Sequence, residues 1–182
     1  MAEIKQVRLS GFGGQGVVLA GVLLGEAGVM DGKYVSGSNS YGAQARGSGC
    51  KAEIVFADGP IDFPHLVTAD ILVAMSQGAY NLYCNDVKES SGFILYDRGP
   101  VTPNEDLRVR QLGIPAADTA VKTLKNKQVT NIVLLGALVE STRVVSRKAI
   151  QKAIRIHVSE RFQDLNLKAL RVGIDLARSV RG

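Results

Sequence analysis

Two glycine-rich stretches hold the residues whose types and spacing could do chemistry in this sequence of 182 residues. The first contains four glycines among six residues and fits the spacing Gly-x-Gly-x-x-Gly. Such glycines allow a tight turn from a strand into a helix, where the backbone N–H groups of the helix start attract an anion, most often a phosphate. Close packing of a helix on a sheet would use the same glycines, so the spacing alone leaves both interpretations open. The candidate binding residues are Gly11, Gly13, Gly14, Gln15 and Gly16.

The residues after this turn argue against ordinary NAD binding. The dinucleotide fingerprint expects an Asp or Glu about 20 residues further on, at the end of the second strand, to hold the ribose. We expect that strand at residues 33–36, and the segment 37–39 that follows it contains no carboxylate. Asp31 precedes the strand. A nucleotide bound here would therefore be held differently, or it would not be NAD.

The second stretch, residues 36–49, is rich in Gly, Ser and Asn and has no apolar periodicity. We predict a long loop between two strands, because long structureless loops in compact domains are usually functional. Its arginine is suited to hold a phosphate or a carboxylate. A plain surface loop is the alternative. The candidate binding residues here are Ser40, Tyr41, Gly42, Arg46 and Gly47.

The rest of the sequence contains no recognisable catalytic or metal-binding set. No pair of carboxylates stands at a revealing spacing, and neither His-x-x-x-His nor Gly-x-Ser-x-Gly occurs. Cys50 and Cys84 are too few for an iron–sulfur cluster, and we expect them to be reduced and buried. His65 and His157 stand alone and are predicted to be structural or exposed. This composition favours a binding or assembly subunit over a self-contained enzyme.

Hydrophobic periodicity predicts an α/β protein with an open, mostly parallel Rossmann-like sheet, flanking helices and a helical C-terminal third, in one domain spanning residues 1–182. Asp97 ends one predicted strand, where it either faces a ligand crevice or begins the next turn. Ser76 is a predicted helix N-cap. Strands are predicted at 6–10, 33–36, 50–56, 69–76, 92–97 and 106–112, and helices at 17–30, 77–87, 116–124, 129–141, 146–161 and 166–179.

The helix predicted at 17–30 is unusual because it is apolar nearly all round and carries Gly21, Gly25 and Gly28 on one face. Three glycines on one face indicate that another backbone packs closely against it. Glu26 is its only charge, which is typical of a helix buried on several sides. Either a partner subunit or later elements of the same chain could cover it.

The overall composition limits the classes of function. The net charge is +5, but aromatic residues are only 5%, and the basic C-terminal third lacks the aromatic residues expected of a nucleic-acid surface. A solvated helix face, an acidic partner or a polyphosphate would account for these charges. No apolar run is long enough to cross a bilayer, and the N-terminus lacks the features of a signal peptide. We therefore expect a soluble, cytoplasmic protein that binds neither nucleic acid nor membrane.

Four motifs, in order, resemble the gamma subunit of 2-oxoacid:ferredoxin oxidoreductases. They are residues 11–16, residues 40–47, residues 70–77, and Asn131 with 135–138. The resemblance covers nearly the whole chain and is greatest to the 2-oxoglutarate type, with the pyruvate and ketoisovalerate types related. Two positions depart from the family pattern, since Ala43 stands where Pro is usual and Ser48 where Gly is usual.

The resemblance implies a complex that oxidatively decarboxylates a 2-oxoacid with coenzyme A, forms an acyl-CoA and reduces ferredoxin. Thiamine diphosphate would be held by the alpha and beta subunits, and the iron–sulfur clusters would also lie outside this chain, with a ferredoxin-like delta subunit as a further partner. The gamma chain would be an α/β domain packed against the thiamine-binding subunits and a contributor to the coenzyme A site. We expect the isolated chain to be inactive. The alternative is a free-standing nucleotide-dependent oxidoreductase with a Rossmann-like domain.

Overall fold

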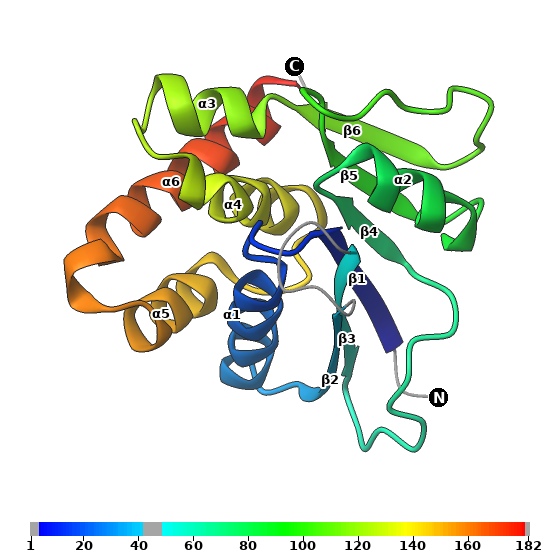
Figure 1. Cartoon of the computed structure of the whole chain (residues 1–182). Coiled ribbons are helices and arrows are strands. Elements are labelled where there is room, and N and C mark those ends of the chain that lie inside the picture. Colours follow the sequence, from blue (N-terminus) through cyan, green and yellow to red (C-terminus); the bar gives the residue numbers. More distant parts are fainter. Residues whose placement is uncertain (1–3, 42–48, 181–182) are drawn as a thin grey trace.

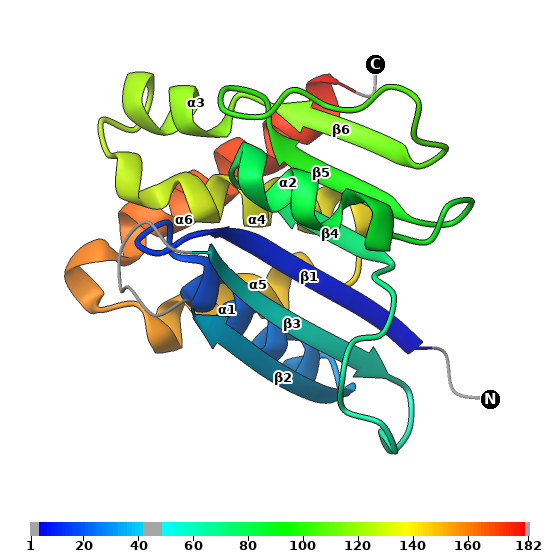
Figure 2. The same cartoon turned by 45° about the vertical axis from the view of Figure 1, so that its right-hand side comes forward.

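A computed structural model describes residues 4–41 and 49–180 of the chain. Its centre is a six-stranded sheet in the order β2-β3-β1-β4-β5-β6 (Figures 1 and 2). Neighbouring strands are parallel from β1 to β6, whereas β3 runs antiparallel to both β1 and β2. The predicted open and mostly parallel α/β sheet is therefore confirmed. The strands are β1 (Ile4–Phe12), β2 (Tyr34–Tyr41), β3 (Gly49–Ala57), β4 (Ile71–Ala74), β5 (Phe93–Asp97) and β6 (Arg110–Ile114).

Helices cover the two faces of the sheet unequally. In Figure 2, α1, α4, α5 and α6 lie behind the strands and α2 lies in front of β4 and β5. The helices are α1 (Val17–Met30), α2 (Gln77–Tyr83), α3 (Ala116–Lys122), α4 (Thr130–Thr142), α5 (Arg147–His157) and α6 (Glu160–Ser179), with short 3₁₀ helices η1 (Cys84–Asp86) and η2 (Lys127–Val129). Among the described residues, no helix has the length and apolar character needed to span a membrane.

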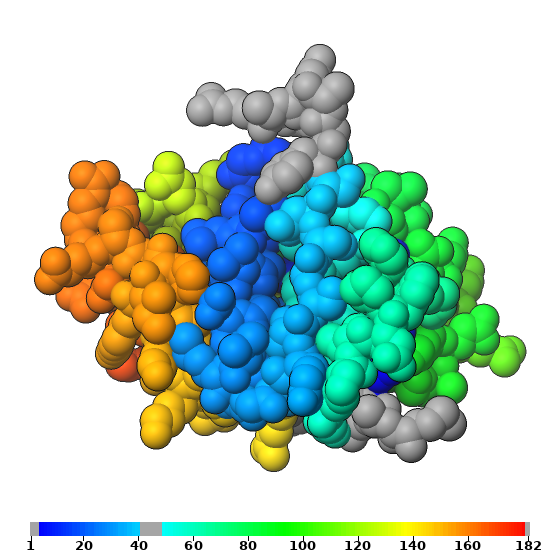
Figure 3. All heavy atoms as spheres, turned by 90° about the horizontal axis from the view of Figure 1, so that it is seen from below, coloured from blue at the N-terminus to red at the C-terminus, as the bar shows by residue number. Residues whose placement is uncertain are grey.

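Helix α1 begins and ends where the sequence predicted, and its glycine face packs on the sheet of its own chain. A Cβ added at Gly21 would lie 2.6 Å from Cβ of Ala52, and one added at Gly28 would strike the ring of Phe56. The sequence had indicated a closely packed backbone, but the nearest neighbours are side chains, those of Ala52 and Phe56 in β3 and of Val35 in β2. Figure 3 shows α1 in blue between the orange α5 and the cyan strands β2 and β3.

The prediction of a loop over 36–49 is wrong for its first half. Residues 34–41 form β2, whose backbone pairs with β3 from Tyr34 opposite Ala57 to Tyr41 opposite Cys50. Backbone hydrogen bonds to β3 hold this strand in place. Because β2 is an edge strand with one largely solvated face, its serines need not alternate with large apolar residues, and the apolar signal of a strand is missing.

Three other predicted boundaries are also corrected. Strand β6 begins at Arg110 rather than at residue 106. The helix predicted to run to 161 ends at His157, because Val158 has an extended backbone (φ −98°, ψ 130°). The last helix begins at Glu160 rather than at 166. Gln163 donates to the carbonyl oxygens of Arg155 (2.8 Å) and Val158 (3.0 Å), which satisfies the end of α5.

Helix α4 lies in the middle of the helical layer, where α6 crosses it at very short range. A Cβ at Gly136 would strike the carbonyl of Leu170, and one at Gly173 would strike the carbonyl of Val133. Sequence reasoning did not single out these two glycines. Nearby, the buried Glu140 of α4 accepts hydrogen bonds from Arg147 of α5 and Arg178 of α6. Burial opposes the ionisation of Glu140, but these hydrogen bonds and charges outweigh it and lower its pKa.

The glycine face of α1 allows a matched test of packing. We expect Gly21→Ala and Gly28→Ala to destabilise the protein by about 2 kcal/mol each, because the added methyl collides with β3. Gly25→Ala should instead stabilise it by about 1 kcal/mol through helix propensity, since the new Cβ would lie 3.7 Å from Val35, an ordinary contact. Urea denaturation of the three variants measures these changes. Equal effects at the three positions would contradict the packing described.

Candidate functional site

The candidate site lies at the carboxyl edge of the sheet, where β1 leads through the glycine turn into α1. Ligands bind at this edge in open α/β sheets. Gly11 is the last glycine before the turn and is confined on several sides. A Cβ there would lie 2.5 Å from Oε1 of Gln15, 3.0 Å from Cβ of Met75 and 3.3 Å from Val17. Only glycine lets the end of β1, the end of β4 and the start of α1 approach this closely.

Both polar ends of the Gln15 side chain are used inside the protein. Its Oε1 accepts a hydrogen bond from the backbone N–H of Phe12 at 2.6 Å, and its Nε2 donates to the carbonyl of Met75 at 3.0 Å. Gln15 therefore connects the turn to the end of β4. Its geometry is that of a residue that positions the turn, and a direct contact from Gln15 to a ligand stays a prediction.

Two of the turn glycines have backbones in the left-handed region. Gly14 has φ +93° and Gly16 has φ +73°. Gly13, the other glycine of this turn, is not among the positive-φ glycines of the described residues. Gly16 is the N-cap of α1, no side chain caps this helix, and its first turn contains no acidic residue. The helix start thus presents backbone N–H groups and a positive dipole end to an anion.

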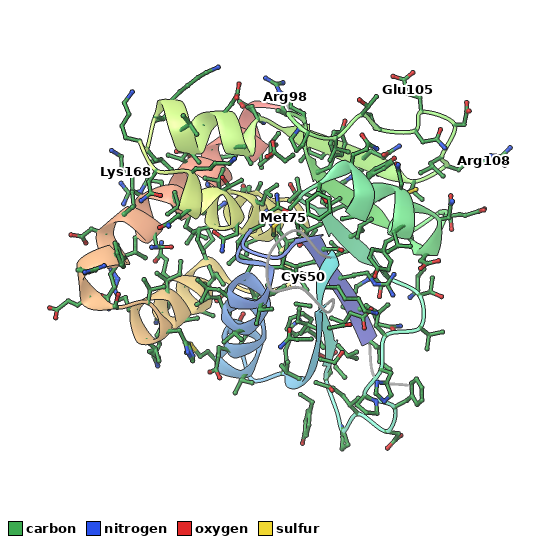
Figure 4. The ribbon with its side chains drawn as sticks, viewed as in Figure 1. Cys50, Met75, Arg98, Glu105, Arg108 and Lys168 are labelled. Atoms are coloured by element: carbon green, nitrogen blue, oxygen red, sulfur yellow. The ribbon has the colours of Figure 1, made fainter. Side chains whose placement is uncertain are left out.

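The structure brings the second candidate segment to the same edge. Cys50, near the start of β3, pairs with Gly11 on one side and with Tyr41 on the other. Figure 4 shows Cys50 and Met75 near each other at the centre of the molecule. Ser40 is exposed close to the end of β2. Gly42, Arg46 and Gly47 lie outside the described residues, so their place at the site stays a prediction.

Asn131 of α4 is a site residue that sequence reasoning left without a role. It is 2% exposed, and its Nδ2 donates to the carbonyl oxygen of Gly16 at 3.0 Å. Its Oδ1 is buried and has no hydrogen-bond partner among the described residues. A Cβ at Gly16 would strike this amide. The sequence did offer a signal for this role, because Asn131 directly precedes the apolar run 132–139 and a buried amide needs hydrogen-bond partners.

The other polar groups at this edge serve as caps. Ser76 is the N-cap of α2 as predicted, and its Oγ accepts from the N–H of Ala79 at 3.3 Å. Buried Asp97 accepts from the N–H groups of Gly99, Ala116 and Ala117, so it joins the turn after β5 to the start of α3. Of the two interpretations of Asp97, the structure supports the one in which it begins the turn after β5 rather than faces a ligand crevice. Burial raises the pKa of Asp97, and the three backbone hydrogen bonds only partly oppose it.

The cysteines and histidines do not form a reactive group. Cys50 and Cys84 are both buried free thiols, as predicted, and burial raises the pKa of each. His157 lies 3.8 Å from a carboxylate oxygen of Glu26, and His65 packs edge-on against Phe63. Across 4–41 and 49–180, no three His, Cys, Asp or Glu side chains gather as a metal site would require. At this edge the described residues therefore present backbone N–H groups to a ligand, while the polar side chains cap turns and helix starts.

Comparison with known proteins places this geometry in a family. The family model for pyruvate ferredoxin/flavodoxin oxidoreductase matches residues 6–176. The chain is 42% identical over 179 residues to the 2-oxoglutarate synthase subunit KorC of Methanocaldococcus jannaschii, covering 97% of this chain and 95% of the relative. The resemblance inferred from the four motifs is confirmed.

Solved structures agree on the fold. The gamma subunit of a keto/oxoacid ferredoxin oxidoreductase from Geobacter sulfurreducens PCA superposes with a TM-score of 0.85 at 38% identity, covering 96% of this chain and 99% of that one. A 2-oxoglutarate:ferredoxin oxidoreductase from Magnetococcus marinus, solved with 2-oxoglutarate, coenzyme A and succinyl-CoA bound, has the same fold. Its TM-score is 0.87 at 23% identity, over 97% of this chain and 31% of that longer one.

These relatives support a subunit of an oxidoreductase complex over a free-standing nucleotide-dependent enzyme. The chain belongs to the pyruvate ferredoxin/flavodoxin oxidoreductase family, among the relatives of its gamma subunits.

Proposed function

We propose that this chain is the gamma subunit of a cytoplasmic 2-oxoglutarate-type 2-oxoacid:ferredoxin oxidoreductase and that its carboxyl edge contributes to the coenzyme A site. The complex would decarboxylate the oxoacid, transfer the acyl group to coenzyme A and pass the electrons to ferredoxin. Alpha and beta subunits would hold thiamine diphosphate, and a ferredoxin-like delta subunit would complete the assembly. The uncapped start of α1 behind the Gly11–Gly16 turn is the observation that carries this proposal.

Coenzyme A suits this edge because its phosphates can accept hydrogen bonds from the backbone N–H groups at the start of α1. Backbone N–H groups at a helix start and arginine side chains are the usual partners of phosphate. A Cβ built at Gly14 meets nothing within 4 Å, so the backbone there is open to an approaching ligand. The Magnetococcus protein was solved with coenzyme A bound, which is consistent with this ligand class.

The chain's own residues would bind and position rather than react. Gln15 and Asn131 hold the turn from its two sides, by hydrogen bonds to the Phe12 N–H, the Met75 carbonyl and the Gly16 carbonyl. Cys50 and Cys84 do not fit an iron–sulfur cluster, since several thiolates at short spacing are needed. The thiamine and cluster chemistry would therefore belong to the partner subunits.

One titration separates this proposal from the alternative. The purified chain should bind coenzyme A more tightly than NADH or NADPH; for NADH the reason is that no carboxylate stands ready for the 2′-hydroxyl of the adenosine ribose. It should turn over none of them without the other subunits. Isothermal titration and absorbance at 340 nm measure this. Micromolar binding of NADH or NADPH together with turnover would establish the free-standing enzyme instead.

In the assembled complex, we expect Arg46→Ala to raise KM for coenzyme A about tenfold while KM for the oxoacid changes little. One charge-assisted phosphate hydrogen bond, at about 1.5 kcal/mol, accounts for that factor. Arg108→Ala, at the margin of the molecule and away from Cys50 and Met75 in Figure 4, is the matched control. An unchanged coenzyme A dependence in Arg46→Ala would reject the role of this segment.

Asn131→Ala should also raise KM for coenzyme A, by about three- to tenfold, because the Gly16 carbonyl loses a hydrogen bond of about 1 kcal/mol and the helix start moves. The limiting rate at saturating coenzyme A should stay close to that of the wild type. Thr130→Ala removes a neighbouring side chain whose hydroxyl bonds to the carbonyl of Lys127 and serves as the control. A fall in the limiting rate with unchanged KM would assign Asn131 a different role.

A further inference from the structure

A trough lined by cations runs along the amino edge of the sheet, opposite the glycine turn. It consists of adjoining hollows of 180, 560 and 330 Å³. Lys33 and Arg143 line both the first and the second hollow, and Lys5 and Thr142 line both the first and the third. Arg110, the first residue of β6, closes the far end. The trough therefore runs along the starts of β1, β4 and β5 and beside the end of α4.

The charges of three trough cations are not neutralised by the described part of the chain. Lys33, Arg110 and Arg143 form no ion pair with a carboxylate of residues 4–41 or 49–180. Aromatic rings hold two of them, with Nζ of Lys33 6.0 Å from the Phe56 centroid and Cζ of Arg110 4.6 Å from the Phe93 centroid. A cation over a ring is held in position while its charge stays available to another group.

The acidic groups beside the trough are already occupied. Glu140 accepts from Arg147 and Arg178. Asp70 accepts from Lys88 at 2.8 Å and from the N–H of Gln6 at 2.7 Å. Asp31 accepts from the N–H and the hydroxyl of Ser146 at the start of α5. Asp31 and Asp58 are therefore the carboxylates on the trough wall that form no ion pair among the described residues, and both oxygens of Asp31 accept from Ser146.

Arg143 stands at a backbone position that favours glycine. It is the residue that ends α4, with φ +53° and ψ +27°, in the left-handed region that L side chains rarely adopt. Its exposed side chain carries a positive charge to the junction of the first two hollows, where a glycine would carry none.

We propose that an acidic segment of another subunit of the oxidoreductase docks in this trough, an inference that rests on the proposed role in a complex. The cations are spread over three hollows rather than converging on one point, which suits an extended acidic peptide better than a compact anion. Arginine-lined grooves recognise acidic motifs in this manner.

Charge reversal in the co-expressed complex tests this docking. Arg110→Glu and Arg143→Glu should each weaken association of the chain with the other subunits about tenfold at about 50 mM NaCl, with a smaller difference at about 500 mM. Arg108→Glu and Lys168→Glu change the net charge equally on exposed surfaces elsewhere (Figure 4) and should have no effect. Retention of the chain on a tagged partner subunit measures the association.

Arg143→Gly keeps the experiment decisive if a glutamate disturbs folding. Glycine suits φ +53°, so this variant should have a Tm equal to or above that of the wild type and still associate more weakly. Wild-type association that none of the reversals weakens would overturn the docking while leaving the proposed subunit role intact. Reversals that abolish the binding of inorganic phosphate but leave association unchanged would also overturn the docking, because the trough would then be a pocket for a small anion. A wild-type chain that associates with no partner would reject both.

Discussion

The close approach of α1 to the sheet is the constraint on which the rest of the structure depends. Gly21 and Gly28 let the helix lie directly on Ala52 and Phe56 of β3, and Gly11 lets β1, β4 and the helix start converge. With α1 held there, its amino end must emerge at the carboxyl edge of the sheet. The uncapped N–H groups and the turn glycines then occupy the place where open α/β sheets bind ligands.

Helix α4 connects the two edges of the sheet. At its start Asn131 holds the Gly16 carbonyl of the turn, and at its middle Gly136 admits the backbone of α6. Toward its end Glu140 joins α5 and α6 through two arginines, and Arg143 reaches the amino-edge trough. One rigid helix thereby ties the proposed coenzyme edge to the proposed docking edge.

The polar side chains near the glycine turn form hydrogen bonds to the protein's own backbone. Gln15, Ser76, Asp97 and Asn131 all hold backbone groups at chain turns or helix ends. Buried groups with such partners are expensive to disturb, so they fix geometry instead of taking part in proton transfer. Among the described residues, these polar side chains therefore hold the backbone of the carboxyl edge in place.

Local patterns in the sequence determined the strand–turn–helix from β1 to α1, the buried strands β4 and β5, the Ser76 cap and the family. Each depends on neighbouring residues, such as the glycine spacing or the continuous apolar run of β4. Tertiary structure alone decided that residues 36–41 pair as a strand, that Cys50 brings Gly11 and Tyr41 to one edge, and that Asn131 meets Gly16. Which backbone a segment pairs with, and which side chain it meets, depends on residues outside that segment, so the pattern within one segment does not show it.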